Sequence, residues 1–256
     1  MKKVLVTAAV RQELSGLEKT LEDSESLPGE SGCYLRGTLA GTEVLLGLTG
    51  IGAGRAGEKI GLFLDAESPE LLLATGFGGG LRGTLRSGDI ILAERVVQAS
   101  GDREEPRELG VDETLLDTLG TISLPSAAVS RGSLLTVEDV VCSAKQKLAL
   151  GSRYGADGVD MESYVILSEA LKREVPCIAA RVVFDEAAFE LPPGLDGIAA
   201  ANGRLSAGRL AALLLRRPWS IPGLLALRSR SVLASGALAV FVKEAVLAWK
   251  DSGQDD

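Results

Sequence analysis

Apolar runs of two kinds alternate along the chain. Residues 3–9 (KVLVTAA) form a short continuous run that is typical of a buried strand, whereas residues 11–22 (RQELSGLEKTLE) place apolar residues at helical spacing. Residues 34–48 (YLRGTLAGTEVLLGL) predict a hairpin that turns near Ala40 and Gly41. The alternation predicts an α/β protein in which helices flank a sheet.

The same alternation continues to about residue 185. A helix is expected from GIGAG to about Asp65, followed by the strand ELLLATG, a glycine-rich loop FGGG and the strand DIILAERVV. Residues 101–122 are polar and irregular, and the pattern assigns them no element. SLLTVEDVV then precedes a helix containing AKQKLALG, GVD precedes a helix from Met161, and PCIAARVVFD predicts a strand. The short connections favour one compact domain.

The C-terminal stretch has a different character. From Arg204 to Lys250 the chain carries eight basic residues and one acidic residue, a local formal charge of +7. Residues 210–227 (LAALLLRRPWSIPGLLAL) are typical either of a helix on an anionic membrane surface or of helices packed on the sheet or a second subunit. The apolar runs look too short to span a bilayer. We expect a catalytic domain over residues 1–203 and a helical extension over 204–256 packed on it.

Charge and cysteine content narrow the class of protein. The formal net charge of −8 argues against a nucleic-acid partner, because phosphate binding needs clustered Lys and Arg. Cys33, Cys142 and Cys177 lack CxxC spacing, which favours reduced thiols and no zinc site. The first apolar run leads straight into Arg11 and Glu13, unlike a signal peptide. We therefore expect a cytoplasmic protein, with contact at the inner membrane surface if the extension binds lipid.

The chain contains no histidine. This excludes a Ser-His-Asp or Cys-His arrangement and a His-ligated metal. If the protein transfers protons near neutral pH, Asp and Glu side chains with shifted pKa values are the expected agents.

Two carboxylates flank a methionine in GVDMES, at residues 158–163, where a strand leads into a helix. Acids at a helix N-terminus are favoured by capping and by the helix dipole, so Asp160 and Glu162 could both be structural. A strand-to-helix junction is also a place where chains present side chains to a ligand. The pattern alone leaves both interpretations open.

Two glycine clusters are candidate ligand loops. Residues 52–57 (GAGRAG) match the dinucleotide fingerprint GxGxxG, but a hairpin precedes them and the next strand ends without the acid that would hold a ribose. This disfavours a nicotinamide or flavin protein. The glycines of TGFGGGL, at residues 75–81, would let the backbone approach a ligand or would simply form a tight turn.

Asp185 directly follows the apolar strand of RVVFDEAAF and lies between Phe184 and Phe189 in the sequence. A carboxylate among aromatic rings at a strand end is costly to ionise, so its pKa should rise and it could act as an acid near neutrality. The alternative is a helix N-cap.

The order of these motifs resembles a known family. An early Glu in AAVRQEL, then TGIGAGRA, TGFGGGL, SGDIIL, GVDMES and RVVFD look like the successive signatures of the nucleoside phosphorylase-I superfamily, across residues 3–190. That family includes purine nucleoside phosphorylases and methylthioadenosine/S-adenosylhomocysteine nucleosidases. The resemblance implies a three-layer αβα sandwich around a mixed, partly barrel-like sheet. It also implies no cofactor, a small-molecule nucleoside substrate, and a homodimer or larger homo-oligomer.

The resemblance also implies roles for individual residues. Glu162 would accept hydrogen bonds from the ribose hydroxyls, and Met161 would pack against the sugar. Asp160 would cap or orient the loop. Asp185 would protonate the purine, and Glu13 would activate the attacking water. Such a pair of carboxylates suits cleavage through an oxocarbenium-like transition state.

Four further residues are candidates for substrate binding. They are Phe77, Gly78, Phe184 and Val141. At Phe77 and Phe184 many nucleosidases of the family have serine, so this chain lacks two hydroxyls that could position Asp185 or the base. Either the acid is set up differently here or the catalytic machinery has degraded.

Phosphorolysis would need a phosphate site, which this family builds largely from arginines. The strand LLLATG has none, and Arg55 is the candidate phosphate ligand. We therefore expect hydrolysis of a purine nucleoside of the adenine type, with phosphorolysis as the alternative. A third hypothesis is a nucleoside-binding protein without turnover.

The C-terminal stretch LLLRRPWSIPGLLALRSRS resembles the tails of the hopanoid-associated branch of the superfamily. This resemblance implies a lipid-linked nucleoside such as adenosylhopane as substrate. A basic, Trp-bearing, leucine-rich segment and the apolar Phe77 and Phe184 would suit such a substrate.

Overall fold

The computed structural model describes residues 2–27, 33–99, 105–191 and 221–252. Ten strands form one mixed sheet, so the α/β class predicted from the sequence is confirmed. The strands are β1 (Lys3–Ala8), β2 (Glu22–Ser26), β3 (Cys33–Leu39), β4 (Thr42–Leu48), β5 (Leu71–Gly80), β6 (Ile90–Gln98), β7 (Arg107–Gly110), β8 (Val129–Thr136), β9 (Gly158–Asp160) and β10 (Cys177–Asp185).

Part of the sheet closes on itself. β5 pairs with β10, β10 with β6, β6 with β8, β8 with β9, and β9 returns to β5, so these five strands form a ring. From β5 the sheet continues as an open layer through β1, β4 and β3 to β2, and β7 pairs with β6. β1 is parallel to β4 and β5, whereas β10 and β6 are antiparallel. The partly barrel-like sheet implied by the resemblance is confirmed.

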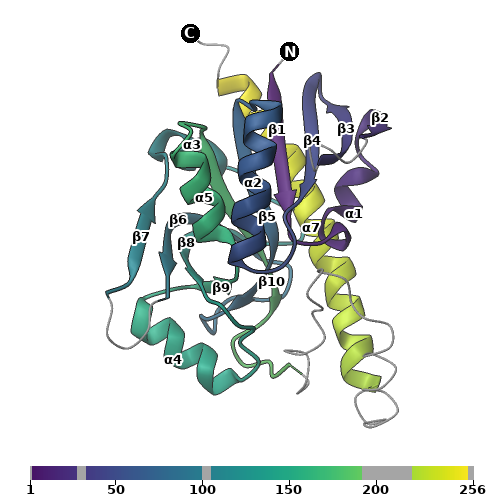
Figure 1. The fold of residues 1–256 in the computed structure, drawn as a ribbon. Helices are drawn as coiled ribbons and strands as arrows, with labels where there is room; N and C mark the ends of the chain where they lie inside the picture. The colour runs from purple at the N-terminus through teal and green to yellow at the C-terminus, as the bar shows by residue number, and fades with distance from the viewer. Residues whose placement is uncertain (1, 28–32, 100–104, 192–220, 253–256) are drawn as a thin grey trace.

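Helices cover both faces of this sheet (Figure 1). Residues of α2 and α5 pack in the core on one face, and residues of α1, α3 and α7 pack in the core on the other. The helices are α1 (Arg11–Glu18), α2 (Ala53–Glu67), α3 (Glu113–Gly120), α4 (Ala144–Tyr154), α5 (Ser163–Leu171) and α7 (Ile221–Ser252). This arrangement is an αβα sandwich.

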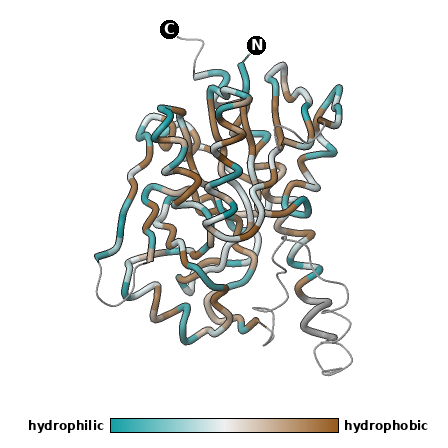
Figure 2. The backbone as a smooth tube through the Cα atoms, in the orientation of Figure 1, coloured by the Kyte–Doolittle hydropathy of each residue, from teal (hydrophilic) through white to brown (hydrophobic). Residues whose placement is uncertain are grey.

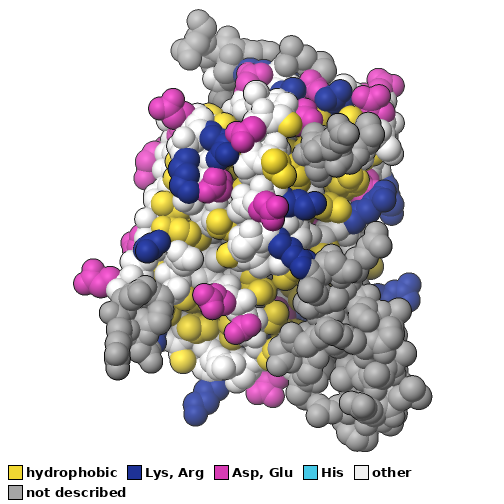
Figure 3. All heavy atoms as spheres, viewed as in Figure 1, with side chains coloured by type: hydrophobic (Ala, Val, Ile, Leu, Met, Phe, Trp, Pro, Cys, Tyr) yellow, Lys and Arg dark blue, Asp and Glu magenta, His cyan; other side chains and the backbone are white. Residues whose placement is uncertain are grey.

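The two cores follow from the alternation of side chains along each strand. In β1, Val4 and Val6 join the core beneath α1 and α7, whereas Leu5 joins the core beneath α2 and α5. Figure 2 shows the hydrophobic residues gathered in the central strands and on the helix faces toward them. On the face drawn in Figure 3, basic and acidic side chains are interspersed.

The predicted hairpin is confirmed. β3 and β4 are antiparallel and are joined by Ala40 and Gly41, whose φ values of 52° and 76° are both positive. Positive φ at both central positions matches the twist of the two strands, and glycine adopts it at little cost.

Three stretches differ from what the sequence pattern predicted or left unassigned. The helix expected over residues 11–22 ends at Glu18, and Glu22–Ser26 forms the edge strand β2. All five residues of β2 are exposed, so its sequence EDSES carries no alternation to reveal it. Residues 101–122, which the pattern left unassigned, contain β7 and α3, and the Asp112 side chain caps α3 by accepting from Leu115 N at 3.0 Å.

The stretch FGGG is also not a loop but the end of strand β5. Its glycines pair with both β9 and β10, where the ring of strands is tightest. A Cβ atom on Gly78 would lie 3.1 Å from Val159 O and 3.3 Å from Arg181 Cβ. Glycine is therefore required for the close approach of three backbones rather than for a turn.

The C-terminal helix α7 packs along α1 and the sheet. Gln12 Nε2 donates to Ser231 Oγ at 2.7 Å, and Ser235 Oγ donates to Gln12 O at 2.7 Å. Phe241 and Val242 are fully buried. The described part of the C-terminal stretch thus follows the interpretation in which a helix packs on the sheet. Residues 204–220, including Arg216 and Trp219, lie outside the described residues.

The apolar length of α7 exceeds the sequence-based expectation. Residues Leu227–Ser252 are long and apolar enough to cross a membrane by length and composition, with a mean hydropathy of 1.7 in their most apolar 18-residue window, so the expectation of runs too short to span a bilayer was wrong. The helix continues without a break through the charged pair Lys243 and Glu244. Half of its most apolar segment is buried within the protein, so those side chains serve the core.

Two neighbouring residues of α7 test whether this helix is part of the core. Phe241→Ala should lower the free energy of unfolding by about 3–5 kcal/mol, because it leaves a cavity at a fully buried site. Val240 is 43% exposed, and Val240→Ala should change it by less than about 0.5 kcal/mol. Urea unfolding of both variants measures the difference. If Phe241→Ala lowered the free energy of unfolding as little as Val240→Ala does, the packing of α7 would not stabilise the fold.

Candidate active site

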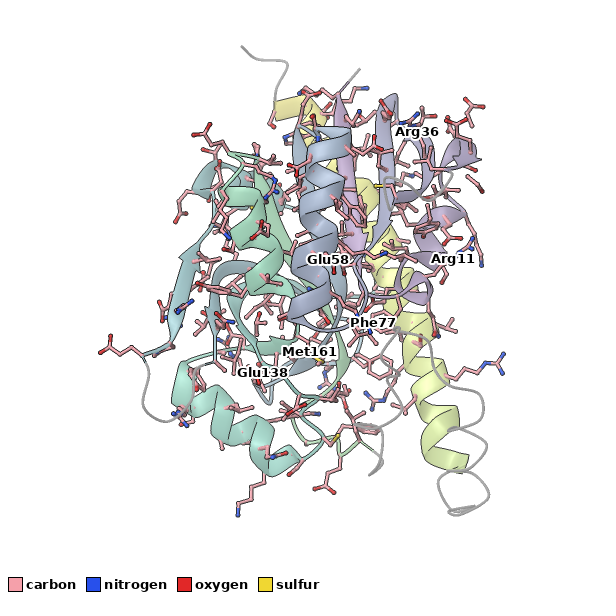
Figure 4. All side chains as sticks on the ribbon, viewed as in Figure 1. Arg11, Arg36, Glu58, Phe77, Glu138 and Met161 are labelled. Atoms are coloured by element: carbon pink, nitrogen blue, oxygen red, sulfur yellow. The ribbon has the colours of Figure 1, made fainter. Side chains whose placement is uncertain are left out.

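The candidate residues gather where β5 and β10 end beside β9. Figure 4 shows Phe77 and Met161 there, below the first turns of α2. The glycine loop before α2 and the N-terminus of α1 contribute from the neighbouring strands β4 and β1. Five segments of the chain therefore meet at one end of the closed ring of strands.

Arg181 of β10 lies at the centre of this region, and its side chain is only 2% exposed. Its Nε donates to Asp160 Oδ2 at 2.6 Å and to Ser163 Oγ at 3.0 Å, and its Nη1 donates to Thr75 O. Its Nη2 is buried without a hydrogen-bond partner among the described residues and lies 4.0 Å from Glu162 Oε2. The two N–H donors of Nη2 are thus unsatisfied among the described residues.

Glu13 is held by backbone N–H groups at both oxygens. Oε2 accepts from Val10 N at 2.9 Å, closing the first turn of α1, and Oε1 accepts from Phe77 N at 2.7 Å. Gly76, with φ 142°, permits this approach, because a Cβ there would lie 2.5 Å from Arg181 Nη1 and 3.1 Å from Glu13 Oε1. Glu13 and Arg181 therefore both hydrogen-bond to the backbone of β5, on either side of Gly76.

The two acids of GVDMES differ in role: one is structural, and the other is placed to meet a ligand. Asp160 is structural, since it accepts from Thr136 Oγ1 at 2.8 Å and from Ser163 N at 3.0 Å, as well as from Arg181. This agrees with its predicted role of orienting the loop. Glu162 instead reaches across to the glycine loop, where Oε1 accepts from Gly52 N at 2.8 Å. Its second oxygen faces Arg181, so Glu162 is the acid available for a ligand.

Burial dominates the electrostatics of this cluster. Burial raises the pKa of Glu162 to about 7, an increase that Arg181 opposes and Asp160 supports. Burial also raises the pKa of Glu13, opposed by the N–H groups of Phe77 and Val10 and by Arg181. Both carboxyl groups therefore bind a proton far more readily than exposed glutamates do, which suits proton transfer near neutral pH.

Asp185 is paired with a residue that the sequence analysis did not identify. The fully buried Lys147 of α4 donates from Nζ to Asp185 Oδ2, to Glu186 O at 3.0 Å and to Phe189 O at 2.8 Å. Burial raises the pKa of Asp185, and Lys147 opposes that increase. Residues 186–191, which directly follow Asp185, are not helical, so the N-cap alternative does not apply. The Asp185 carboxylate is therefore held by a hydrogen bond from a lysine rather than from a neighbouring hydroxyl.

Phe77 and Phe184 stack on each other, with ring centroids 5.2 Å apart and planes 11° from parallel. Phe77 lies two residues before Gly79, and Asp185 Oδ1 would be 3.6 Å from a Cβ on Gly79. The stacked rings, the glycines of β5 and the Asp185 carboxylate are therefore neighbours. They form an apolar wall beside the acid.

The other predicted residues lie around this centre. Met161 is half-buried between Asp160 and Glu162, and Val141 packs with the cluster that contains Val159. Arg55 lies in the first turn of α2, one turn from the Gly52 that binds Glu162, and its side chain runs along Gly50. No described residue pairs with its guanidinium. The structure brings all the predicted site residues to one end of the sheet.

Arg181 and Lys147 were missed, although each left a signal in the sequence. Arg181 is the one cation in the otherwise apolar strand CIAARVVF, and a charge in a buried strand needs a partner. Lys147 shares a helical face with Leu150 and Tyr154, three and seven residues later, both of which pack in the core. A cation on the apolar face of a helix predicts a buried acid opposite it.

No group of three or more Cys, Asp or Glu side chains in the described part of the chain is arranged to hold a metal ion. The carboxylates are instead neutralised by Arg181 and Lys147.

The raised pKa of Glu162 predicts a cost in stability. The folded protein keeps the proton of Glu162 up to about pH 7, whereas the unfolded chain releases it above about 4.5, so stability falls as pH rises through that window. Glu162→Gln keeps an acceptor for Gly52 N and should raise the free energy of unfolding above pH 7 by up to about 3 kcal/mol. Urea unfolding across pH measures this.

The exposed Glu58 of α2 provides the control. Glu58→Gln should change the free energy of unfolding by no more than about 0.5 kcal/mol at any pH. A Glu162→Gln protein that is less stable than the parent at alkaline pH would contradict the assignment of a raised pKa.

Comparison with known proteins extends the likeness to whole chains. Residues 3–216 match the family described as the phosphorylase superfamily. A 5'-methylthioadenosine/S-adenosylhomocysteine nucleosidase of Tolumonas auensis is 25% identical over 227 residues, which cover 83% of this chain and 98% of that protein.

Solved structures share the fold. Futalosine hydrolase of Helicobacter pylori, in a mutant form, superposes with a TM-score of 0.74 at 18% identity over 96% of this chain and 99% of that one. The 5'-methylthioadenosine/S-adenosylhomocysteine nucleosidase of Neisseria meningitidis, in complex with methylthio-immucillin-A, gives 0.74 at 20% identity over the same shares. Because the family match spans most of the chain, this protein belongs to the phosphorylase superfamily.

Proposed function

We propose that this protein hydrolyses the N-glycosidic bond of a purine nucleoside of the adenine type. The observation that carries the proposal is the arrangement of Glu13 and Glu162 around Arg181, with Asp185 at the end of the same strand as Arg181. Relatives of the chain are nucleosidases, which supports this reaction over others known for α/β folds.

Glu162 is assigned to the sugar. Its Oε1 is fixed by Gly52 N and its Oε2 faces Arg181, so the carboxylate has a defined orientation before a ligand binds. Ionised, it can accept hydrogen bonds from the 2′- and 3′-hydroxyls of a ribose at once. Met161, half-buried beside it, supplies an apolar surface for the sugar ring.

Glu13 is assigned to the nucleophile. A carboxylate whose pKa is raised by burial is a stronger base than an exposed one, so it can take a proton from water as the water oxygen attacks C1′. Arg181 Nη2, which has no partner among the described residues, can hold the same water by donating to its oxygen. The proton moves to Glu13 as the C1′–O bond forms.

Asp185 is assigned to the leaving group. When protonated, it donates to a ring nitrogen of the base, so that the electron pair of the breaking C1′–N bond is accepted by a neutralised purine. Phe77 and Phe184 beside it exclude water from the base. Free purine and the ribose product leave together with no cofactor consumed.

Phosphorolysis is the alternative reaction, with Arg55 as the candidate phosphate ligand. Its side-chain stem lies against Gly50, in the glycine loop that also contacts Glu162. Base release measured with and without phosphate decides between the two reactions. Release without phosphate identifies a hydrolase, release only with phosphate identifies a phosphorylase, and tight binding without release identifies a nucleoside-binding protein.

Replacing the acid tests the mechanism. Asp185→Asn should lower the rate of adenine release about 10²- to 10⁴-fold, the usual contribution of a general acid, while nucleoside binding is retained. Glu190→Gln, an exposed neighbour five residues later, should leave the rate unchanged. Adenine is followed by chromatography and binding by calorimetry. An unaltered rate for Asp185→Asn in a folded protein would remove Asp185 from this role.

For the substituent on the sugar, we favour a lipid-linked nucleoside. The stacked Phe77 and Phe184 provide an apolar wall at the site, and α7 presents Val232 at 68% exposure and Leu233 at 53%. Arg228 is exposed on the same helix. An apolar, basic helix beside the site suits an enzyme that takes its substrate from the cytoplasmic surface of a membrane.

Vesicle binding tests this preference for lipid. The protein should co-sediment with anionic liposomes, and Val232→Asp should weaken that binding several-fold, whereas Leu62→Asp should not, because Leu62 is 56% exposed on α2 at the opposite face of the sheet. Failure to bind anionic liposomes, together with equal cleavage of methylthioadenosine and a lipid-linked adenosine, would rule the lipid-linked substrate out.

A further inference from the structure

A buried lysine with three acceptors is the least expected group near the acid. Lys147 is 0% exposed, and its Nζ reaches the Asp185 carboxylate, Glu186 O at 3.0 Å and Phe189 O at 2.8 Å. An ammonium group has three N–H donors, so each of them has a partner. The buried amino group of Lys147 is therefore fully satisfied inside the protein.

Stability alone does not explain this pair. Desolvation of two charges offsets most of their attraction, and well-packed apolar residues of similar size often stabilise a fold as well as a buried ion pair. Lys147 also binds a specific oxygen of Asp185, namely Oδ2. No described residue donates a hydrogen bond to Oδ1, so that oxygen is left for a ligand.

The residue before the acid cannot position it. Phe184 has no hydrogen-bonding group in its side chain, and its ring is stacked on Phe77. The backbone around the acid is instead tied to Lys147 through the carbonyls of Glu186 and Phe189. Lys147 thus holds both the carboxylate and the loop that follows it.

We infer that Lys147 is the positioning residue of the leaving-group acid: it fixes Asp185 Oδ2 so that Oδ1 meets the base, and its charge limits the pH up to which Asp185 keeps a proton. This inference rests on the proposed function, because it assigns Asp185 to the purine. It adds a residue of α4 to the machinery of the site.

The charges facing Asp185 give the sign of the effect. Lys147 approaches from α4 and Arg230 from α7, and Glu186 follows in the chain. Burial raises the pKa of Asp185, Lys147 and Arg230 oppose that rise, and Glu186 supports it. Removing Lys147 therefore raises the pKa further. An acid that must be protonated to act would then work to a higher pH.

Two substitutions separate charge from hydrogen bonding. Lys147→Met removes both, and it should move the alkaline limb of the pH profile of kcat upward by about 1–3 pH units while lowering the plateau about tenfold or more. Lys147→Gln is neutral but can still donate to Oδ2, so it should show the same shift with a smaller loss of plateau. Lys145→Met, on an exposed position of the same helix, should show neither change.

The shift in pH and the loss of rate have different origins, so a merely structural lysine would not reproduce both. A folded Lys147→Met protein whose limb stays within about 0.3 pH unit of the parent would overturn the inference. An equal shift in Lys145→Met would also overturn it, because a change in net charge alone would then be the cause.

Adenine binding gives a readout that does not need turnover. Binding measured by calorimetry across pH should extend to higher pH in Lys147→Met by the same shift, because protonated Asp185 donates to the base. If the parent protein binds adenine but releases none from nucleosides, the proposed function fails while this comparison still decides the role of Lys147. If the parent protein neither releases nor binds adenine, both proposals are overturned.

Discussion

One buried guanidinium, that of Arg181, makes the acidic site compatible with a folded protein. It bonds directly to Asp160 and lies 4.0 Å from Glu162, and its charge opposes the rise in the pKa of Glu13 that burial causes. Without a cation, three carboxylates buried together would each take up a proton, since burial disfavours the charged form. Arg181 extends from β10, which pairs with β5 on one side and β6 on the other, so the cation is fixed by the closed ring of strands.

The number of hydrogen bonds that each acid makes separates structural acids from functional ones. Asp160 accepts hydrogen bonds from Thr136, Ser163 and Arg181, and these bonds fix the junction between β9 and α5. Glu162 accepts one hydrogen bond, from the backbone, and keeps a raised pKa. A buried acid that the fold leaves incompletely satisfied destabilises the protein, and such a cost is typical of a site prepared for a ligand.

Patterns among neighbouring residues in the sequence were enough to predict most of the fold. They were not enough to predict which cations pair with the acids. The apolar runs of β1, β5 and β10 and the turn at Ala40 and Gly41 depend on neighbouring residues, so they could be predicted. Lys147 meets Asp185 across 38 residues, and Arg181 meets Asp160 across 21. Those pairs arise only when the ring of strands closes. The order of motifs located the acids, yet it could not say which cation faces each of them.

The loop that follows β10 connects the acid to the C-terminal helix. Arg230 of α7 donates to Phe184 O at 3.4 Å and to Glu186 Oε2 at 3.2 Å, and its guanidinium lies 4.2 Å from the Phe189 ring centroid. From α4, Lys147 donates hydrogen bonds to two carbonyl groups of the same loop. Asp185 is thus positioned by two helices at once, one of which packs along α1 with exposed apolar residues on its outer side. A displacement of α7 would be transmitted through Arg230 to the backbone beside Asp185, so the position of the C-terminal helix affects the proposed site.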